Sequence, residues 1–395
     1  MVGASGINRT VAHPSDCAIP GTEFLSNQMT FFRRRVKEMQ TVPNVGTMVY
    51  RIDPINDVRW TEFVQRHPKA SVFHSVGWLQ ALRSTYRYEP LAYTTSSPNQ
   101  ELQNGLLFCL VDSRITGRRL VSLPFTDHCD PLCDSTENLV QLLSFSQQVL
   151  EQENLKYLEL RPTRGDFGEA NGVTSFFPTA KFFLHTLSLT PSLVELFQEF
   201  DKNCVQRRVQ RAERADLVER HGRSEELLKD FFTLFALTRG RLHLPFTPID
   251  WFRNLIRHLE GGVEIRLAYK ENTPIAAVLT LRFKETVYYK YGCSDARFNR
   301  FGAMPWLLWR TIVEAKTNGA VAFDLGRTEA DNLGLLAFKN HFVPQPQPLT
   351  YWRYPNASSL DSLYGWKLRV AKRVFSCFPN SFLKIIGRST YRHIG

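Results

Sequence analysis

The chain shows one order of predicted elements twice, and this repetition constrains its fold more than any other sequence feature. Residues 46–190 and 191–355 each run through helices, several short strands, a further helix and closing strands. The two ranges share no literal sequence repeat. A repeated order without repeated letters predicts two similar lobes, each with a mixed α/β sheet.

The hydrophobic period separates the helices from the strands. "TENLVQLLSFSQQVLEQEN" spaces Leu and Val as on one face of a helix, with Thr136 as the expected N-cap. Apolar stretches such as "VEIRLAYK" and "TVYYKYGCS", bounded by turn residues, predict strands. A long helix is predicted over 191–215, opened by Thr190 and Pro191, and we expect it to link the lobes.

The two ends of the chain differ from its middle. Residues 1–45 are rich in Ser, Thr, Pro, Asn and Gly, so they are predicted to be disordered. Residues 356–395 form a basic tail with seven lysines and arginines against one aspartate, over half of the net charge of +11. Its interleaved apolar and basic residues are typical of a helix on an anionic membrane surface. An arm packed on the protein, or a partner-binding helix, fits the composition equally well.

Several classes of protein are disfavoured. The sequence shows neither a secretory signal pattern nor an apolar run of membrane-spanning length, and its seven cysteines are scattered and odd in number. We therefore expect a cytoplasmic protein with reduced thiols. Cys129 and Cys133, beside His128, lack a second pair with ligand spacing, so no zinc site is predicted there. The motifs of serine hydrolases, zinc metalloproteases and P-loop kinases are absent from the sequence.

Four short strings occur in an order and at gaps that match a known superfamily. They are "FHSVGWLQAL" (73–82), "LPFTDHCDPL" (123–132), "QRRVQRAERADLVER" (206–220) and "FDLGRTEADNLGLLAFKNHF" (323–342). Together they resemble the FemAB/FemX-like superfamily, in its acetyltransferase (GNAT) branch, over about residues 47–355. The resemblance implies an α/β fold of two tandem GNAT-like acyltransferase lobes.

The resemblance also implies acyl transfer. FemX-type enzymes move an aminoacyl group from a charged tRNA to an amine of a cell-wall precursor, and related GNAT enzymes use acyl-CoA. The expected reaction transfers an acyl or aminoacyl group to an amino sugar or peptide group of a cell-envelope or exopolysaccharide precursor. Acyl-CoA is the expected co-substrate and aminoacyl-tRNA the alternative. We expect a glycan or amino-sugar acceptor, and no DNA, metal or permanently bound cofactor.

The donor's phosphates need backbone amides and cations at a helix start. GNAT enzymes usually supply Gln/Arg-x-x-Gly-x-Gly/Ala between a strand and a helix. Here "RFNRFGAM" stands in that place, and Arg297 and Gly302 fit the pattern, but Arg300 replaces the first glycine. Arg207 and Arg211 lie one helical turn apart and are predicted to bind anionic groups. An ordinary basic loop and a solvated helix face remain the plain alternatives.

The transfer step needs a group that orients or deprotonates the acceptor and a donor for the oxyanion. Asp127, just after the strand "RRLVSLPF", is predicted for the first role, with Tyr291 as a second candidate. Lys339 is predicted to meet phosphate or the developing oxyanion.

Two further residues lie at a strand end. Asp324 and Arg327 follow the strand "AVAFDLG", at the edge where open α/β sheets bind ligands. Asp331 or Asn332 is expected to cap the next helix.

A second function belongs to another class of protein. The chain could be a catalytically inert adaptor that holds a polysaccharide synthesis complex at the inner face of the membrane through its basic tail. Arg300 in place of the first glycine favours this alternative, because a side chain there hinders close backbone approach to phosphate.

Overall fold

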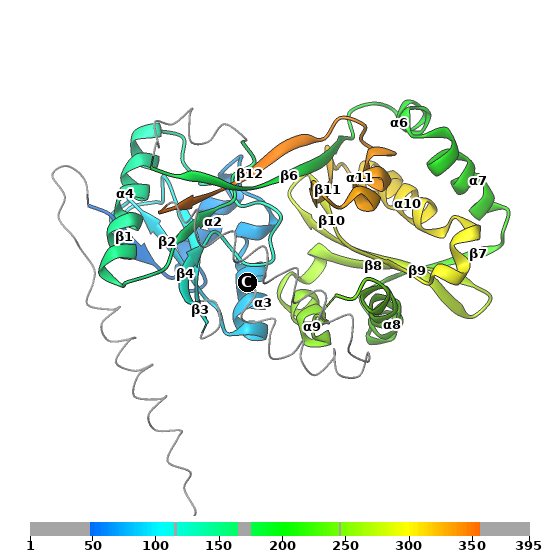
Figure 1. The fold of residues 1–395 in the computed structure, drawn as a ribbon, viewed down its shortest axis with the longest axis horizontal. Coiled ribbons are helices and arrows are strands. Elements are labelled where there is room, and N and C mark those ends of the chain that lie inside the picture. Colours follow the sequence, from blue (N-terminus) through cyan, green and yellow to red (C-terminus); the bar gives the residue numbers. More distant parts are fainter. Residues whose placement is uncertain (1–47, 114–116, 165–174, 245, 356–395) are drawn as a thin grey trace, which may run out of the picture. The chain divides into compact units, whose positions relative to one another are not determined.

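Twelve strands form one mixed sheet in this computed structural model, which describes residues 48–113, 117–164, 175–244 and 246–355 (Figure 1). The strand order is β1-β2-β3-β4-β5-β12-β6-β11-β10-β9-β8-β7. The strands are β1 (Tyr50–Ile52), β2 (Glu89–Thr94), β3 (Leu106–Ser113), β4 (Gly117–Val121), β5 (Leu158–Leu160), β6 (Phe177–Ser188), β7 (Leu217–Gly222), β8 (Val263–Lys270), β9 (Thr273–Phe283), β10 (Thr286–Ser294), β11 (Ala322–Glu329) and β12 (Gln347–Tyr354).

Helices flank this sheet, so the predicted mixed α/β class is confirmed. The α-helices are α2 (Val58–Arg66), α3 (Val76–Tyr86), α4 (Thr136–Gln152), α6 (Leu193–Glu199), α7 (Arg207–Glu213), α8 (Glu225–Arg241), α9 (Ile249–His258), α10 (Ala303–Thr317) and α11 (Leu333–Asn340). Shorter helical turns are η1 (Val72–His74), η2 (Lys202–Gln206), η3 (Glu260–Gly262) and η4 (Ala296–Phe301). Among the described residues, no helix is both long and apolar enough to cross a membrane.

Two strands connect the halves of the sheet. β12, from the end of the described chain, pairs with β5 on one side and β6 on the other. β6 in turn pairs with β11. Figure 1 shows β6 and β12 running between one group of strands, β1–β5, and a second group, β7–β11. Each half therefore exchanges its closing strand with the other. The lobe boundaries at 46–190 and 191–355 stay a prediction.

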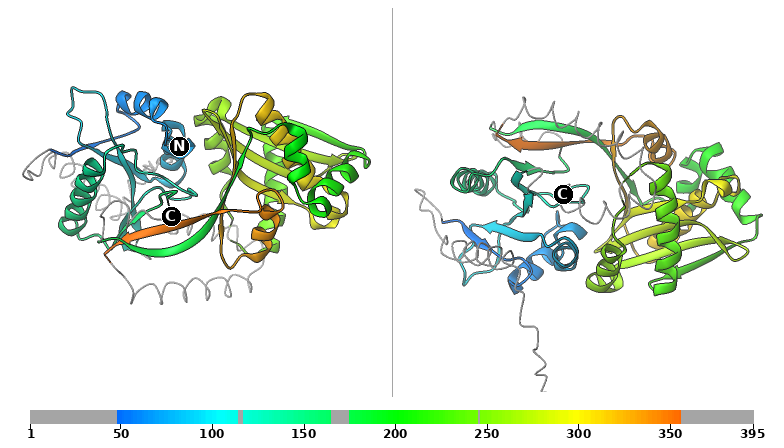
Figure 2. Two further views of the ribbon diagram at one scale, coloured as in Figure 1. Left: turned by 90° about the horizontal axis from the view of Figure 1, so that it is seen from above. Right: turned by 60° about the horizontal axis from the view of Figure 1, so that its bottom comes forward.

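Helices cover both faces of the second group of strands, β7–β11 (Figure 2). Along β9, Ala277 and Leu279 belong to the core that includes α8 and α9. Their neighbours Ala276 and Val278 belong to the core that includes α7 and α10. Successive strand residues point to opposite faces, so a continuous apolar run is what a sheet covered on both sides requires.

One hydrophobic core joins the two halves of the chain. Trp78 of α3 and Trp251 of α9 are fully buried, and their rings meet edge to face with centroids 5.1 Å apart. Asn254 of α9 donates a hydrogen bond to Thr85 of α3 over 2.9 Å. Gly77 allows this approach, since a Cβ there would clash with the carbonyl of His258.

The single helix predicted over 191–215 is wrong. Ser192, rather than Thr190, caps α6 in a capping box with Glu195. The helix ends at Phe200, which has extended backbone angles and is buried against Phe342. The carboxylate of Asp201 then accepts from two backbone amides and begins η2, which continues into α7. A hydrophobic period does not reveal such a break, because the apolar residues keep helical spacing across it.

The predictions for residues 1–45 and 356–395 lie outside the described residues.

Replacing Gly77 by Ala should lower the free energy of unfolding by about 2 kcal/mol, because overpacking a tight contact costs roughly 1–3 kcal/mol. Urea unfolding of the full chain measures this. Gly334→Ala is the matched control, since a Cβ at that helical glycine meets nothing within 4 Å. Equal stability of Gly77→Ala and the wild type would contradict the close α3–α9 contact.

Candidate active site

Neighbouring strands β10 and β11 part halfway along their length. They pair in parallel only from Thr286 and Ala322 to Tyr288 and Asp324, although both strands continue further. β10 carries a bulge at Lys290, since its register with β9 shifts between Tyr289 and Tyr291. β11 carries a second irregularity between Asp324 and Arg327 in its pairing with β6. Bulges redirect side chains, and here two of them lie beside the point of parting.

The loop that follows β4 in the first half reaches this point. The Asp127 carboxylate lies 2.8 Å from Nζ of Lys290, and its other oxygen lies 3.9 Å from Nε of Arg327. Gly326 has φ +73°, and a Cβ there would lie 3.2 Å from Oδ2 of Asp127. Glycine is therefore needed at 326 both for the backbone angle and for the approach of the carboxylate.

A second contact between the halves is buried beside the first. Nε2 of His128 lies 3.0 Å from Oδ2 of Asp324. The other oxygen of Asp324 accepts a hydrogen bond from the Gly326 amide over 2.6 Å. Burial lowers the pKa of His128, but the hydrogen bond and charge of Asp324, together with the charges of Asp130 and Asp127, outweigh it, so that this pKa is raised. This contact fixes the loop relative to β11.

Helix α11 buries its one charged residue. Lys339 is 3% exposed, whereas Leu333 of the same helix is 71% exposed. Nζ of Lys339 donates to the carbonyl oxygens of Gly326 and Arg327 over 3.0 and 2.9 Å. Burying an ammonium group is costly even when it is hydrogen-bonded. A role for Lys339 in the reaction stays a prediction.

The surroundings favour the charged form of Asp127 and the neutral form of Lys339. Burial would raise the pKa of Asp127, but Lys290 and Arg327 outweigh it and lower the pKa to about 2. Burial lowers the pKa of Lys339 to about 8, although Asp127 and Asp324 oppose this. Asp127 is thus ionised throughout the neutral range and suited to orienting an amine. Lys339 can gain and lose a proton near neutral pH.

A pocket opens at the start of α10. It has a volume of about 200 Å³ and is lined by residues of α7, η4, α10 and α11, including Arg208, Gly302, Met304 and Phe338. Gly302 has φ +76°, and a Cβ there would clash with the Arg208 carbonyl. Amides in the first turn of a helix lack intrahelical partners and attract anions. Phe338 lines this pocket, and the next residue, Lys339, belongs to the charged cluster.

The structure brings together four of the residues predicted from sequence: Asp127, Asp324, Arg327 and Lys339. Gly302 lies apart from them, in the pocket wall. The hydroxyl of Tyr291 accepts a hydrogen bond from Trp251 over 2.8 Å, within an aromatic group of α8, α9 and β10. A role for Tyr291 in the reaction stays a prediction.

The other predicted anion-binding residues lie on the surface near the pocket. Arg297 forms an ion pair with Asp295, and its side chain is 79% exposed. Arg207 donates to Asn203, and Arg211 donates to the Arg300 carbonyl. Both lie on the exposed face of α7.

Sequence reasoning did not assign Lys290 a place at the site. Lys290 stands between tyrosines in "YYKYG", and a charge inside an apolar strand is the signal that could have marked it. The Lys290 side chain points toward Asp127 because of the bulge in β10, and the alternation of side chains along a strand does not reveal a bulge. Lys290 also lies over the rings of Phe73 and Trp78, at 5.0 and 5.6 Å from their centroids.

Comparison with known proteins identifies the second half of the chain. Residues 202–340 match the family model described as "Acetyltransferase (GNAT) domain". This part of the chain is therefore similar to GNAT acetyltransferase domains. Pocket and charged cluster both involve this domain, and the loop with Asp127 reaches it from outside the matched residues. A GNAT domain supports acyltransferase activity, and such domains typically take acyl-CoA as co-substrate.

Solved structures extend the likeness of fold to both halves. FemX has a TM-score of 0.61 at 15% identity, covering 79% of this chain and 99% of its own. L-PGS from Bacillus licheniformis has a TM-score of 0.52 at 14% identity, covering 84% and 98%. A tandem GNAT protein from the clavulanic acid biosynthesis pathway has 0.50 at 10%, covering 77% and 97%. No curated protein sequence matches the chain. The predicted tandem GNAT-like fold is confirmed, and the likeness in fold to FemX is consistent with the predicted FemAB/FemX-like superfamily.

Replacing Lys339 by Met should change how stability depends on pH. The lysine pKa is 10.5 in the unfolded chain and about 8 in the fold. Between these values the unfolded state binds more protons, so wild-type stability rises with pH. The wild type should gain up to about 3 kcal/mol relative to Lys339→Met from pH 8 to 10.5, since one pKa unit corresponds to about 1.4 kcal/mol.

Urea unfolding of both proteins across this range measures the difference. Lys229→Met removes an exposed lysine of α8 and is the control for the substitution itself. A difference between wild type and Lys339→Met that does not change with pH would refute the proposed environment of the ammonium group.

Proposed function

We propose that this protein transfers an acyl or aminoacyl group to an amine, or a hydroxyl, of a cell-envelope or exopolysaccharide precursor. The observation that carries the proposal is the position of α11, which sets Phe338 in the pocket and Lys339 in the charged cluster. A donor in the pocket would thus hold its acyl carbon close to groups that can handle charge and protons. The acceptor class rests on the resemblance to FemX-like proteins, whose fold the chain shares.

The donor's phosphates would bind at the start of α10. Gly302 lets the chain turn there, and the first amides of the helix together with Arg208 offer donors and positive charge. Acyl-CoA is the expected donor. The exposed Arg207 and Arg211 extend the positive surface along α7, as a longer anionic donor such as aminoacyl-tRNA would need.

The transfer step assigns different work to the charged groups. The acceptor amine attacks the acyl carbonyl, and a tetrahedral intermediate with a negatively charged oxygen forms. The Lys339 ammonium would stabilise that oxygen, and Asp127 would hold the amine by an N–H hydrogen bond. When the intermediate collapses, the amine's proton passes to the leaving thiol or hydroxyl. The low pKa of Asp127 favours orientation over deprotonation, whereas Lys339 has a pKa suited to relaying the proton.

Incubating the full chain with an amino-sugar nucleotide and either acyl-CoA or charged tRNA tests the function. Mass spectrometry of the small molecules should detect the acylated acceptor with one of the donors. Lys339→Ala should lower kcat at least about 100-fold, as loss of an oxyanion donor does. Lys229→Ala should transfer at the wild-type rate. Full activity of Lys339→Ala would return α11 to a structural role.

The pocket makes a separate prediction for the donor. Arg208→Gln should raise the KM for the donor about 10-fold or more, because a hydrogen bond to a charged group contributes roughly 1.5–3 kcal/mol. Arg214→Gln, an exposed position at the end of the same helix, is the matched control and should leave KM unchanged. An equal effect of both variants would point to general surface charge rather than to the pocket.

The adaptor is the alternative outcome. It is favoured by Arg300, which stands where a glycine of the phosphate loop is expected and lies in η4. We propose a cytoplasmic location in either case, with the tail as a peripheral membrane contact. No transfer with any donor, together with membrane binding that is lost when residues 356–395 are removed, would support the adaptor.

A further inference from the structure

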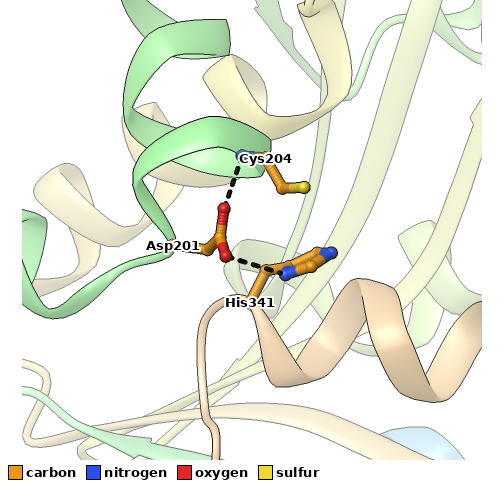
Figure 3. Close-up of side chains that lie close together, drawn as sticks. All are labelled: Asp201, Cys204 and His341. Atoms are coloured by element: carbon orange, nitrogen blue, oxygen red, sulfur yellow. Dashed lines mark hydrogen bonds and ion pairs between the residues drawn. The ribbon is translucent and has the colours of Figure 1, made fainter.

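Three side chains of different chemistry meet where η2 approaches the end of α11. Figure 3 shows Asp201 and Cys204 from one segment and His341 from the other. One ligand atom of each lies within 4.8 Å of the other two. Carboxylate, thiolate and imidazole together form a donor set typical of Zn²⁺.

The backbone holds the two segments in place. The amide of Asp201 donates to the carbonyl of His341 over 3.0 Å. The adjacent residues Phe200 and Phe342 are both buried, with ring centroids 5.1 Å apart. One hydrogen bond between two of the ligand residues and one ring contact between their neighbours therefore fix segments that are far apart in sequence. A site held in this way loses little conformational freedom on binding an ion.

The carboxylate of Asp201 is oriented for a second task. Oδ1 accepts hydrogen bonds from the amides of Asn203 and Cys204 over 2.9 and 2.6 Å. Oδ2 is turned toward His341 and lies 3.6 Å from its Nδ1. Tetrahedral Zn²⁺ with bonds of about 2.0–2.3 Å places neighbouring ligand atoms about 3.3–3.7 Å apart. This oxygen and this nitrogen already have that spacing.

Helix capping alone explains only part of the arrangement. It accounts for Oδ1 of Asp201, but not for a thiol and an imidazole beside Oδ2. Among the described cysteines, Cys204 is the one that is not buried.

A second cluster in the described residues provides a contrast. His221, Glu264 and Glu314 also lie close together. There the buried Arg266 forms ion pairs with both glutamates, so a cation already neutralises them. No such cation pairs with Oδ2 of Asp201 other than His341 among the contacts of the described residues. The two clusters therefore differ in whether their acidic groups are already satisfied.

We propose that Asp201, Cys204 and His341 bind a divalent ion of the Zn²⁺ type, with water as the fourth ligand. Binding replaces the thiol proton, which passes to solvent, and the two ligand charges then balance the ion. The ion would tie η2, and the basic helix α7 that follows it, to the end of α11. Lys339 lies two residues before His341, so the ion would also fix the helix that positions Lys339. The site takes no part in the transfer step and does not depend on the proposed function.

Cobalt is a suitable probe, because thiolate coordination to Co²⁺ produces a near-ultraviolet charge-transfer band. The full chain, stripped of metal, should develop this band on titration with Co²⁺ and lose it on addition of Zn²⁺. Cys204→Ser should abolish the band, and His341→Gln should weaken Co²⁺ binding at least 10-fold. His221→Gln, in the second cluster, is the matched control and should bind as the wild type does. Circular dichroism checks that each variant is folded.

A second test needs only the wild-type protein. Zn²⁺ should slow alkylation of Cys204 by iodoacetamide, as followed by peptide mapping, because a bound thiolate is a poor nucleophile. Unchanged alkylation of Cys204 would overturn the proposal. A cobalt band that persists in folded Cys204→Ser, or binding that is lost in His221→Gln instead, would overturn it as well.

Discussion

The site depends on the parting of β10 and β11 beyond Tyr288 and Asp324. Strands that part leave backbone groups without partners in the sheet, and buried backbone groups must be hydrogen-bonded. On β11 the ammonium group of Lys339 supplies the missing partner by donating hydrogen bonds to the carbonyls of Gly326 and Arg327. A charged side chain thus satisfies two backbone carbonyls of β11 just beyond the point of parting.

Charge balance explains the composition of the cluster. Asp127 and Asp324 face Lys290, Arg327 and Lys339, so positive groups exceed negative ones before His128 is counted. Each carboxylate is paired by contacts at 3.0 Å or less. Lys339, whose own contacts are carbonyl oxygens, and Arg327, which lies 3.9 Å from Asp127, are left to respond to a new negative charge. A ligand that develops negative charge during reaction is therefore favoured there over one that carries positive charge.

The cluster is assembled from both halves of the chain at an energetic cost. Leu123 and Phe125, in the loop before Asp127, both have φ +63°, which is unfavourable for large side chains. The loop keeps this conformation because the surrounding structure holds it, through His128 on Asp324 and through the shared core of Trp78 and Trp251. Strain and a buried lysine at one place are expected where function, rather than stability, has determined the sequence.

The sequence was sufficient for the order of elements, since helices and strands differ in hydrophobic period and most boundaries carry turn residues. It also pointed to four residues that the structure brings together: Asp324 and Arg327 because polar residues at the end of an apolar strand are visible in one dimension, and Asp127 and Lys339 through the family resemblance. It did not reveal Lys290 as a partner of Asp127, which lies 163 residues away. Pairings of this kind depend on a bulge and on the meeting of two halves, and neither leaves a periodic signal.

The orientation of helix α11 depends on contacts with other parts of the chain. Its start follows from the sequence, since Asn332 caps it by accepting from the Leu335 amide, as one of two expected caps. Its orientation does not, because amphipathic reasoning would bury the leucines of "LGLLAFKN" and expose the lysine. In the structure Lys339 is buried, whereas Leu333 is exposed and the other two leucines are half-buried. The Asp201 amide donates to the carbonyl of His341 at one end of the helix, and a carbonyl of β11 accepts from Lys339 along its side. The position of Lys339 is thus determined by η2 and β11 rather than by the helix that carries it.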